Sequence, residues 1–466
     1  MSQPNNAPDA QKLKHPSITI TIIALSYLLL IADGSIAVTA LPAIKHQMNI
    51  STTTLSWVQN SYSLAFGGLL LFGARIGDVF GRLKMFVFGL IGFITASLIV
   101  GIAPNAGILF TGRVLQGVAG AILAPSTLAL LSTAFPKNPG RAKALSIYSS
   151  ITGIGTTFGL VLGGFITNAF SWRWAFLINL PIGILLALAA KKYLFEIERH
   201  QGRIDYLGAV FSTLGMSSLV FGLVKAADLG WSNSITISSL MYAVVILALF
   251  VAIESRTARP LMPLHLLKSR HRSGSNFSRF LFVGSMAGYW FFVSQFLQIA
   301  KGYSPLQAGF AFLPMTLASF GIAFLIPSLT RKFGDSKVLI TGLITVMTGT
   351  LWLSRLTIHG SFFWQIAVPL MLVGLGQGAS TIRLTTAAMQ GVSPHDAGAA
   401  SGIVSTAVQL GSAFGLSLLL SIATTVTQHD LSTVRTIEQH TRIALASGGG
   451  LIAIALLSAL IFVVRD

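Results

Sequence analysis

The sequence predicts an all-α polytopic membrane protein. Of its 466 residues, 53% are hydrophobic and only 9% are charged, whereas a soluble domain carries about 25% charged residues. Apolar stretches of about 20 residues, each long enough to cross roughly 30 Å of hydrocarbon, recur from the first tens of residues almost to Asp466. No segment between them is long enough for a soluble domain.

Apolar runs bounded by polar breaks predict fourteen membrane-spanning helices. The first six are expected at 18–41, 53–74, 83–102, 106–128, 142–167 and 173–194. Two further runs lie at 206–224 and 235–253. The last six lie at 275–299, 305–328, 337–356, 362–385, 397–424 and 442–464. The predicted architecture is therefore two six-helix halves with two helices inserted between them.

Basic residues are distributed unevenly among the segments that join these helices. If the chain starts inside, 21 lysines and arginines lie in cytoplasmic segments and seven lie outside. Because basic residues near helix ends keep loops in the cytoplasm, we expect both termini to be cytoplasmic and the protein to lie in a bacterial inner membrane. The net charge of +18 then reflects loops that meet anionic lipid, and nucleic acid is not an expected partner.

Several kinds of site are not supported by the sequence. There is no cysteine, which excludes disulfides, thiolate metal sites and cysteine nucleophiles. The loop histidines lack HExxH spacing, and no Walker-type loop occurs. We therefore expect no metal, no cofactor and no ATP-driven transport. An enzyme is disfavoured because no nucleophile, metal cluster or catalytic dyad accompanies the intramembrane acid described next.

Two ionisable residues lie deep in predicted spans. Asp33 is a single carboxylate inside the first span, and Arg113 lies in the fourth. A mid-membrane arginine keeps its proton and needs an anion, water or helix carbonyls, so Asp33 is its expected partner. Desolvation favours the protonated form of such a carboxylate, and a nearby arginine favours the charged form. We predict that Asp33 alternately holds a proton from outside and a cationic or polar substrate group from inside, so that charge competition couples the two fluxes, and that Arg113 tunes it. A purely packing role for Asp33 is the alternative.

The loop over 74–84, after the second span, combines basic residues, one carboxylate and glycines. Gly81 permits a tight turn and close helix approach. Asp78 can cap a neighbouring helix N-terminus or pair with an arginine, and such a contact breaks when two halves separate. We predict that Asp78, Gly81 and Arg82 form a conformational latch; an ordinary basic turn is the alternative.

A weak internal repeat indicates that the two halves are related. Two sets of residues recur at offsets of 256 and 253 residues, more than six spans need. The excess corresponds to the helix pair between about 195 and 273, and parallel halves predict rocking around a central cavity. The recurring positions are Gly155, Phe158, Gly159 and Leu160 with Gly411, Phe414, Gly415 and Leu416, and Phe80, Gly81 and Lys84 with Phe333, Gly334 and Lys337.

Candidate substrate contacts are concentrated in the ninth span, which mixes aromatic and amide side chains suited to flat or cationic organic molecules. Arg279 lies near the cytoplasmic end of this span, where it can snorkel, and Arg383 lies deeper in the twelfth, which would allow an anionic or zwitterionic substrate. The predicted cavity residues are Gln59, Tyr62, Gln116, Tyr289, Trp290, Phe292, Gln295, Gln298 and Arg383.

These motifs resemble those of the major facilitator superfamily. The 74–84 loop matches the signature between helices two and three at Asp78, Gly81 and Arg82, with Ala74 and Val79 as departures. The segment 113–117 resembles the buried-arginine motif, which carries its role beside the cavity over to Arg113. The segment 155–164 is similar to the antiporter motif of drug exporters, although Leu160 replaces a proline and should reduce the helix kink. The matching positions are Gly155, Gly159, Gly163 and Gly164.

Further sequence segments resemble the fourteen-spanner drug:proton antiporter family, so that the resemblance covers nearly the whole chain. They lie at 31–42, 172–183, 205–208, 302–309 and 396–402. The predicted spans and the repeat offset divide the chain into a cytoplasmic tail at 1–17, a six-helix bundle at 18–194, a two-helix linker at 195–273 and a second bundle at 274–466.

The leading hypothesis is secondary active export of small amphiphilic, cationic or polyspecific drug-like compounds by proton antiport with alternating access. The expected partners are the substrate, protons and the lipid bilayer, and a monomer is expected. The alternative is export of an anionic or zwitterionic metabolite through Arg383 and Arg113, with weak or no proton coupling.

Overall fold

The computed structural model describes residues 15–50, 52–135, 140–196, 205–257, 260, 262–393, 396–426 and 433–464. The first half comprises α1 (Pro16–Met48), α2 (Thr52–Phe80), α3 (Arg82–Gly101), α4 (Ala106–Ala134), α5 (Gly140–Ala169), α6 (Trp172–Leu177) and α7 (Asn179–Tyr193). The inserted segment comprises α8 (Tyr206–Leu229), α9 (Ser234–Glu254) and α10 (His265–Lys268). The second half comprises α11 (Arg270–Gln295), η1 (Phe296–Ala300), α12 (Pro305–Ala311), α13 (Leu313–Phe333), α14 (Asp335–Leu353), η2 (Phe363–Ala367), α15 (Val368–Ala388), α16 (Ala397–Val426) and α17 (Thr433–Phe462).

Thirteen helical segments in the described ranges are long and apolar enough to cross a membrane, and they follow the predicted spans in order. The helix α5 takes the place of the fifth span with 30 residues, of which Phe158–Ala169 forms the apolar part. Several helices run past the predicted ends: α1 continues beyond position 41 to Met48, with Lys45 and His46 in its last turn. Basic side chains in the last turn interact favourably with the helix dipole, so the polar residues after position 41 continue α1 and do not end it.

The two halves repeat each other's packing, as the internal repeat predicts. In the first half α5 packs along α1, and in the second half α16 packs along α11. Glycine makes both contacts close, because a Cβ at Gly159 would lie 2.6 Å from the Ala32 carbonyl oxygen and one at Gly415 would lie 2.2 Å from Gly284 Cα. The repeated glycines are therefore the positions where two helix backbones touch.

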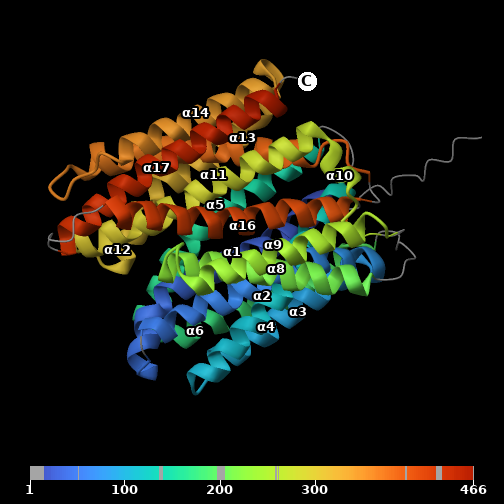
Figure 1. The fold of residues 1–466 in the computed structure, drawn as a ribbon, viewed down its shortest axis with the longest axis horizontal. Helices are drawn as coiled ribbons and strands as arrows, with labels where there is room; N and C mark the ends of the chain where they lie inside the picture. The colour runs from blue at the N-terminus through green and yellow to red at the C-terminus, as the bar shows by residue number, and fades with distance from the viewer. Residues whose placement is uncertain are drawn as a thin grey trace, which may run out of the picture.

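The inserted helices α8 and α9 form a hairpin beside the first half (Figure 1). The helix α8 packs against both α2 and α16, so it contacts both halves, whereas α9 packs on α8. A Cβ at Gly68 of α2 would lie 2.1 Å from Ser217 Oγ of α8, which shows how closely this helix is seated. The division into a linker and two bundles remains a prediction, and this packing is compatible with it.

The halves are closed against each other at one end of the bundle, which we call the basic end. It holds the α2–α3 junction, α10 and the α13–α14 junction, and exposed Lys84 and Lys332 lie there. Figure 1 shows it at the side of α10, with α6 and α12 at the opposite end. Buried side chains of both halves form one apolar cluster near the basic end, including Leu128, Leu131, Leu145, Met389, Ala400, Ile403 and Val404.

Candidate functional site

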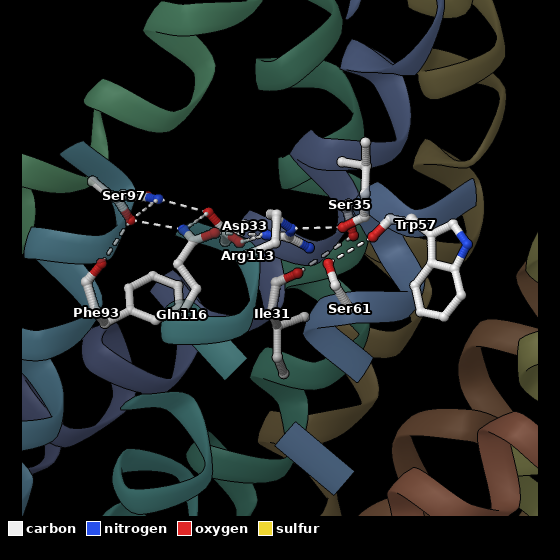
Figure 2. Close-up of polar contacts among 11 residues, drawn as sticks. Ile31, Asp33, Ser35, Trp57, Ser61, Phe93, Ser97, Arg113 and Gln116 are labelled. Atoms are coloured by element: carbon white, nitrogen blue, oxygen red, sulfur yellow. Dashed lines mark hydrogen bonds and ion pairs between the residues drawn. The ribbon is translucent and has the colours of Figure 1, made fainter. Parts of the chain in front are cut away.

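Asp33 lies on α1 with its carboxylate fully buried inside the first half (Figure 2). Arg113 on α4 donates from Nη1 to Asp33 Oδ2 at 2.8 Å, so the partner expected from the sequence is in place. Both side chains are 0% exposed. Charges removed from water in this way need further hydrogen bonds on their remaining atoms.

Two amides complete the shell around the carboxylate. Asp33 Oδ1 accepts from Gln116 Nε2 at 3.1 Å and from Asn179 Nδ2 at 2.7 Å. The same two nitrogens also donate to Ser97 Oγ, at 2.8 Å and 3.2 Å. The network therefore joins α1, α3, α4 and α7. Asn179 and Ser97 were not among the predicted site residues.

The Arg113 guanidinium is held by the backbone and by aromatic rings as well as by Asp33. Its Nε donates to the Val58 carbonyl at 2.9 Å, and Nη1 also donates to Gln116 Oε1 at 2.9 Å. Its central carbon lies 4.5 Å from the Tyr62 ring centroid and 5.8 Å from that of Phe176. Aromatic faces stabilise a desolvated cation. Tyr62, predicted to line a cavity, is thus placed against the arginine.

The hydrogen-bond pattern determines what this network can do chemically. Asp33 accepts from Arg113, Gln116 and Asn179, a pattern that fits the ionised carboxylate because an ionised carboxylate only accepts. A proton on the carboxylate would remove its negative charge and leave Arg113 buried without a counter-charge. Proton uptake would therefore weaken the ion pair between α1 and α4, which links protonation to helix position.

The face of α1 that meets the second half is different from the face that carries Asp33. A small cavity of about 40 Å³ lies between the halves. Gln298 is the predicted cavity residue that lines it, and a molecule in this cavity would not touch Asp33 in this conformation. The complete lining is Val38, Thr39, Leu160, Ser294, Gln298, Ala308, Gly309 and Phe312.

The other predicted cavity residues are distributed over several environments. Tyr289 and Phe292 are buried in the core of the second half, where the Tyr289 hydroxyl donates to Met315 Sδ at 2.6 Å. The half-buried Trp290 ring packs 4.5 Å from Phe312, which lines the cavity. Gln59 and Gln295 are partly buried in α2 and α11. Of the ninth-span candidates, only Gln298 therefore lines this cavity directly.

Three glycines of the predicted antiporter motif form the face of α5 that meets α1. A Cβ at Gly155 would lie 2.9 Å from Ile31 Cγ2, and one at Gly163 would lie 2.4 Å from Thr39 Oγ1. Gly159 lies between these two glycines and packs against Ala32 and Ser35, which flank Asp33 on α1. Gly164 points elsewhere, and its nearest neighbour would be Leu306 N at 3.9 Å. The motif thus fixes α1, the helix that carries the buried acid.

Of the predicted latch residues, Asp78 lies where the two halves meet at the basic end, and Arg82 and Gly81 support it from the first half. Arg82 donates from Nε to Asp78 Oδ1 at 3.0 Å and from Nη1 to Thr133 Oγ1 at 2.9 Å. The Asp78 carboxylate lies against the first turn of α16, where a Cβ at Gly398 would be 2.0 Å from Asp78 Oδ1. A carboxylate at a helix N-terminus is stabilised by the helix dipole. Asp78 therefore pairs with an arginine, as one of the two predictions had it, and also lies close to the N-terminus of α16.

Glu196, which was not predicted from the sequence, stabilises the junction between α2 and α3. It accepts from the backbone nitrogen atoms of Leu83 and Lys84 at 3.1 Å each and so caps the start of α3. Gly81 precedes that helix with a φ of 106°, a conformation that favours glycine. A Cβ at Gly81 would also lie 2.7 Å from Glu196 Oε2.

Replacing Asp78 with asparagine is expected to open the basic end. Loss of the negative charge at the N-terminus of α16 should cost about 1–2 kcal/mol, which shifts the closed-to-open ratio about tenfold. The measurement is the distance between spin labels on Lys84→Cys and Lys332→Cys, placed in a chain that has no other cysteine. The matched control is Glu438→Gln, which removes a partly exposed carboxylate of α17 and should leave the distance unchanged. An unchanged distance distribution in Asp78→Asn would contradict the latch.

The two remaining arginine candidates lie apart from Asp33. Arg383 lies near the basic end of α15 and forms an ion pair with Asp335 at the start of α14. Arg279 does not snorkel to an exposed position: it is 5% exposed and donates to Thr385 of α15. The structure therefore does not bring Arg383 and Arg113 into one site. In the described part of the chain, no group of three or more His, Asp or Glu residues is arranged to hold a metal ion.

Comparison with known proteins gives a consistent result. A family model described as Major Facilitator Superfamily matches residues 23–416. The puromycin resistance protein of Streptomyces alboniger is 34% identical over 88% of this chain and 82% of its own length. The cephamycin export protein of Amycolatopsis lactamdurans is 34% identical over 88% and 86% of the two chains.

Solved structures show the same fold. The crystal structure of the human organic anion transporter MFSD10 superimposes with a TM-score of 0.67 over 95% of this chain and 99% of that chain. Sequence identity is 14%, so this likeness concerns the fold alone.

Proposed function

The chain belongs to the Major Facilitator Superfamily, and from this premise we propose that it is a secondary active exporter of small amphiphilic, drug-like compounds that exchanges them for protons. The relatives named above are a resistance protein and an export protein, which supports outward transport of small molecules. Proton antiport rests on the site itself.

The observation that carries the proposal is the buried hydrogen-bond network of Asp33. An acid deep in a membrane-spanning helix is a functional group by default, because burying a charge there is costly. Protonation of Asp33 would remove the negative charge that balances buried Arg113 and so would destabilise the present arrangement of α1 against α4. A proton can therefore drive a change of conformation rather than only occupy a site.

This geometry favours coupling through the helices over direct competition between proton and substrate. Asp33 is fully buried and separated from the cavity between the halves, so a cationic group on a substrate would not reach it here. The alternating-access cycle would instead use α1 as the moving part, with the Asp78 contact to α16 stabilising the state closed at the basic end.

The proposed setting is a bacterial inner membrane with both termini and the basic end in the cytoplasm. The bacterial sources of the relatives and the lysines at the basic end support this orientation. Nothing in the described ranges favours export through Arg383 and Arg113 together, since each is paired with an acid in a different half.

The proposal is tested by efflux of a fluorescent lipophilic cation from proteoliposomes with and without an imposed pH gradient. The unaltered protein should accelerate efflux when the gradient is present, and Asp33→Asn should reduce this acceleration by about tenfold or more because the proton site is gone. Asp33→Glu should retain part of it.

The matched control is Glu438→Gln, which neutralises a partly exposed acid on α17 and should leave gradient-driven efflux unchanged. Efflux by Asp33→Asn that still responds fully to the gradient would overturn the role of Asp33. No efflux of the cation by the unaltered protein would instead point to a substrate of different charge.

A further inference from the structure

Arg279 is a buried cation that the coupling mechanism does not use. It lies on α11 in the interior of the membrane-spanning region and is 5% exposed. Its hydrogen bonds come from Nη1, to the Thr381 carbonyl at 3.4 Å and to Thr385 Oγ1, and its buried Nε has no partner. Among the described residues, no carboxylate lies within ion-pair distance of it.

Two tyrosines of the first half face this arginine across the interface. Tyr27 of α1 and Tyr148 of α5 stack with ring centroids 4.3 Å apart, and both act electrostatically on the Arg279 guanidinium. The Tyr148 hydroxyl hydrogen-bonds Thr127 Oγ1 of α4 at 2.9 Å. Hydroxyl groups from α1, α4, α5 and α15 therefore gather where the two halves meet.

The position of this group is directly inside the closed basic end. Tyr148 belongs to the mixed apolar cluster in which Leu145 of the first half and Met389 of the second half are also buried. When the basic end opens, the contacts of this cluster separate and the hydroxyl-lined arginine becomes the inner surface of the opening. A molecule entering from that side would meet Arg279 early.

The positive charge of Arg279 determines which kind of ligand would fit this site. A guanidinium cannot lose its proton, and a buried cation without a counter-charge is costly unless an anion or water is available. The hydroxyls of Thr127 and Thr385 already donate to backbone carbonyls, and the Tyr148 hydroxyl bonds Thr127, so these neutral groups cannot neutralise the arginine. The buried Arg279 Nε remains as a donor for an anion, and the site lacks negative charge.

We propose that Arg279, with Tyr27 and Tyr148, binds a carboxylate or phosphate group of the transported molecule when the basic end is open. This inference rests on the proposed export function and adds a preference to its substrate range: among compounds with the same apolar body, those with an anionic group, including zwitterions, bind more tightly. The planar guanidinium suits a two-oxygen anion because its paired donors match both oxygens.

The test uses three probes that share one apolar body: pyrenebutyrate, pyrenebutanol and a pyrenebutyl-trimethylammonium salt. Binding to the full-length protein in phosphatidylcholine nanodiscs is followed by pyrene fluorescence. The unaltered protein should bind the carboxylate at least about tenfold more tightly than the alcohol, as expected for a charge-assisted hydrogen bond. Arg279→Gln should abolish this difference and leave binding of the alcohol unchanged, and Arg279→Lys should retain part of it.

Two controls separate the possible outcomes. Arg383→Gln removes an arginine that is already paired with Asp335 and should preserve the preference for the carboxylate. Nanodiscs with one third phosphatidylglycerol test whether a lipid phosphate is the anion, since occupancy by lipid would weaken binding of the carboxylate probe without affecting the alcohol. Equal binding of carboxylate and alcohol by the unaltered protein, or a preference that persists in Arg279→Gln, would overturn the proposal.

Failure of this proposal is distinguishable from failure of the export function. Gradient-driven efflux of pyrenebutanol depends on Asp33 and not on Arg279 in this scheme. If Arg279→Gln keeps that efflux while the carboxylate preference was never present, export stands and the anion site does not. If Asp33→Asn has no effect on efflux of any of the three probes, proton coupling through Asp33 is wrong whatever the binding data show.

Discussion

Replacing Arg113 with leucine is expected to destabilise the protein by about 3–5 kcal/mol, because it leaves the Asp33 carboxylate buried without its counter-charge. Asp33 is 0% exposed, and the amides of Gln116 and Asn179 donate to it but carry no charge. The measurement is the free energy of unfolding in detergent, taken from denaturant titrations of Arg113→Leu and the unaltered protein.

The double variant Asp33→Asn with Arg113→Leu provides the control. It removes both charges, so the loss of stability should be much smaller than in Arg113→Leu alone, and the two substitutions should be strongly non-additive. Equal stabilities of Arg113→Leu and the double variant would mean that the ion pair is not the reason for the loss.

Replacing Gly159 with valine is expected to destabilise the first half by about 3 kcal/mol, because a side chain there must push α5 away from α1. A Cβ at Gly159 would lie 2.6 Å from the Ala32 carbonyl oxygen and 2.9 Å from Ser35 Cβ, and backbone atoms cannot move aside as a flexible side chain can. The measurement is the melting temperature and the monodisperse fraction of the purified protein.

Gly164, five residues further along the same helix, is the matched control. A Cβ there would come no closer than 3.9 Å to a neighbouring atom, Leu306 N, so Gly164→Ala should be nearly neutral and Gly159→Ala should already be harmful. Similar melting temperatures for these two alanine variants would show that the close packing of α1 on α5 is not needed for stability.

The fold was largely predictable because membrane spans are long and uniform in composition. Thirteen of the helical segments found here follow the apolar runs, and the repeated glycines correctly indicated equivalent helix pairs in the two halves. The contact of Asp78 with Arg82 was also within reach, because the two residues are four apart around one glycine turn. Local spacing and composition were sufficient for these features.

The shell around Asp33 was predictable only in part. Arg113 was expected as the partner of Asp33 because a buried cation requires an anion, and both charges can be read from the sequence. Ser97 and Asn179 are neutral, and their contacts depend on how α3 and α7 are rotated against α1, which hydropathy does not specify. Arg383 was predicted to lie deep in a span, but it lies near the end of α15. The apolar pattern does not reveal its partner Asp335, which is 48 residues away in sequence on the neighbouring helix.

The helix α7 connects the surroundings of Asp33 with the junction beside Asp78. Asn179 begins it and holds Asp33, and Glu196, three residues past its end at Tyr193, holds the start of α3 beside the latch. Fifteen helical residues span about 22 Å at a rise of about 1.5 Å each. Because a helix transmits axial displacement without shortening, movement of Asn179 at the middle of the membrane is felt at the membrane surface. In the proposed cycle, protonation of Asp33 and release of the Asp78 contact would therefore be coupled through movement of α7.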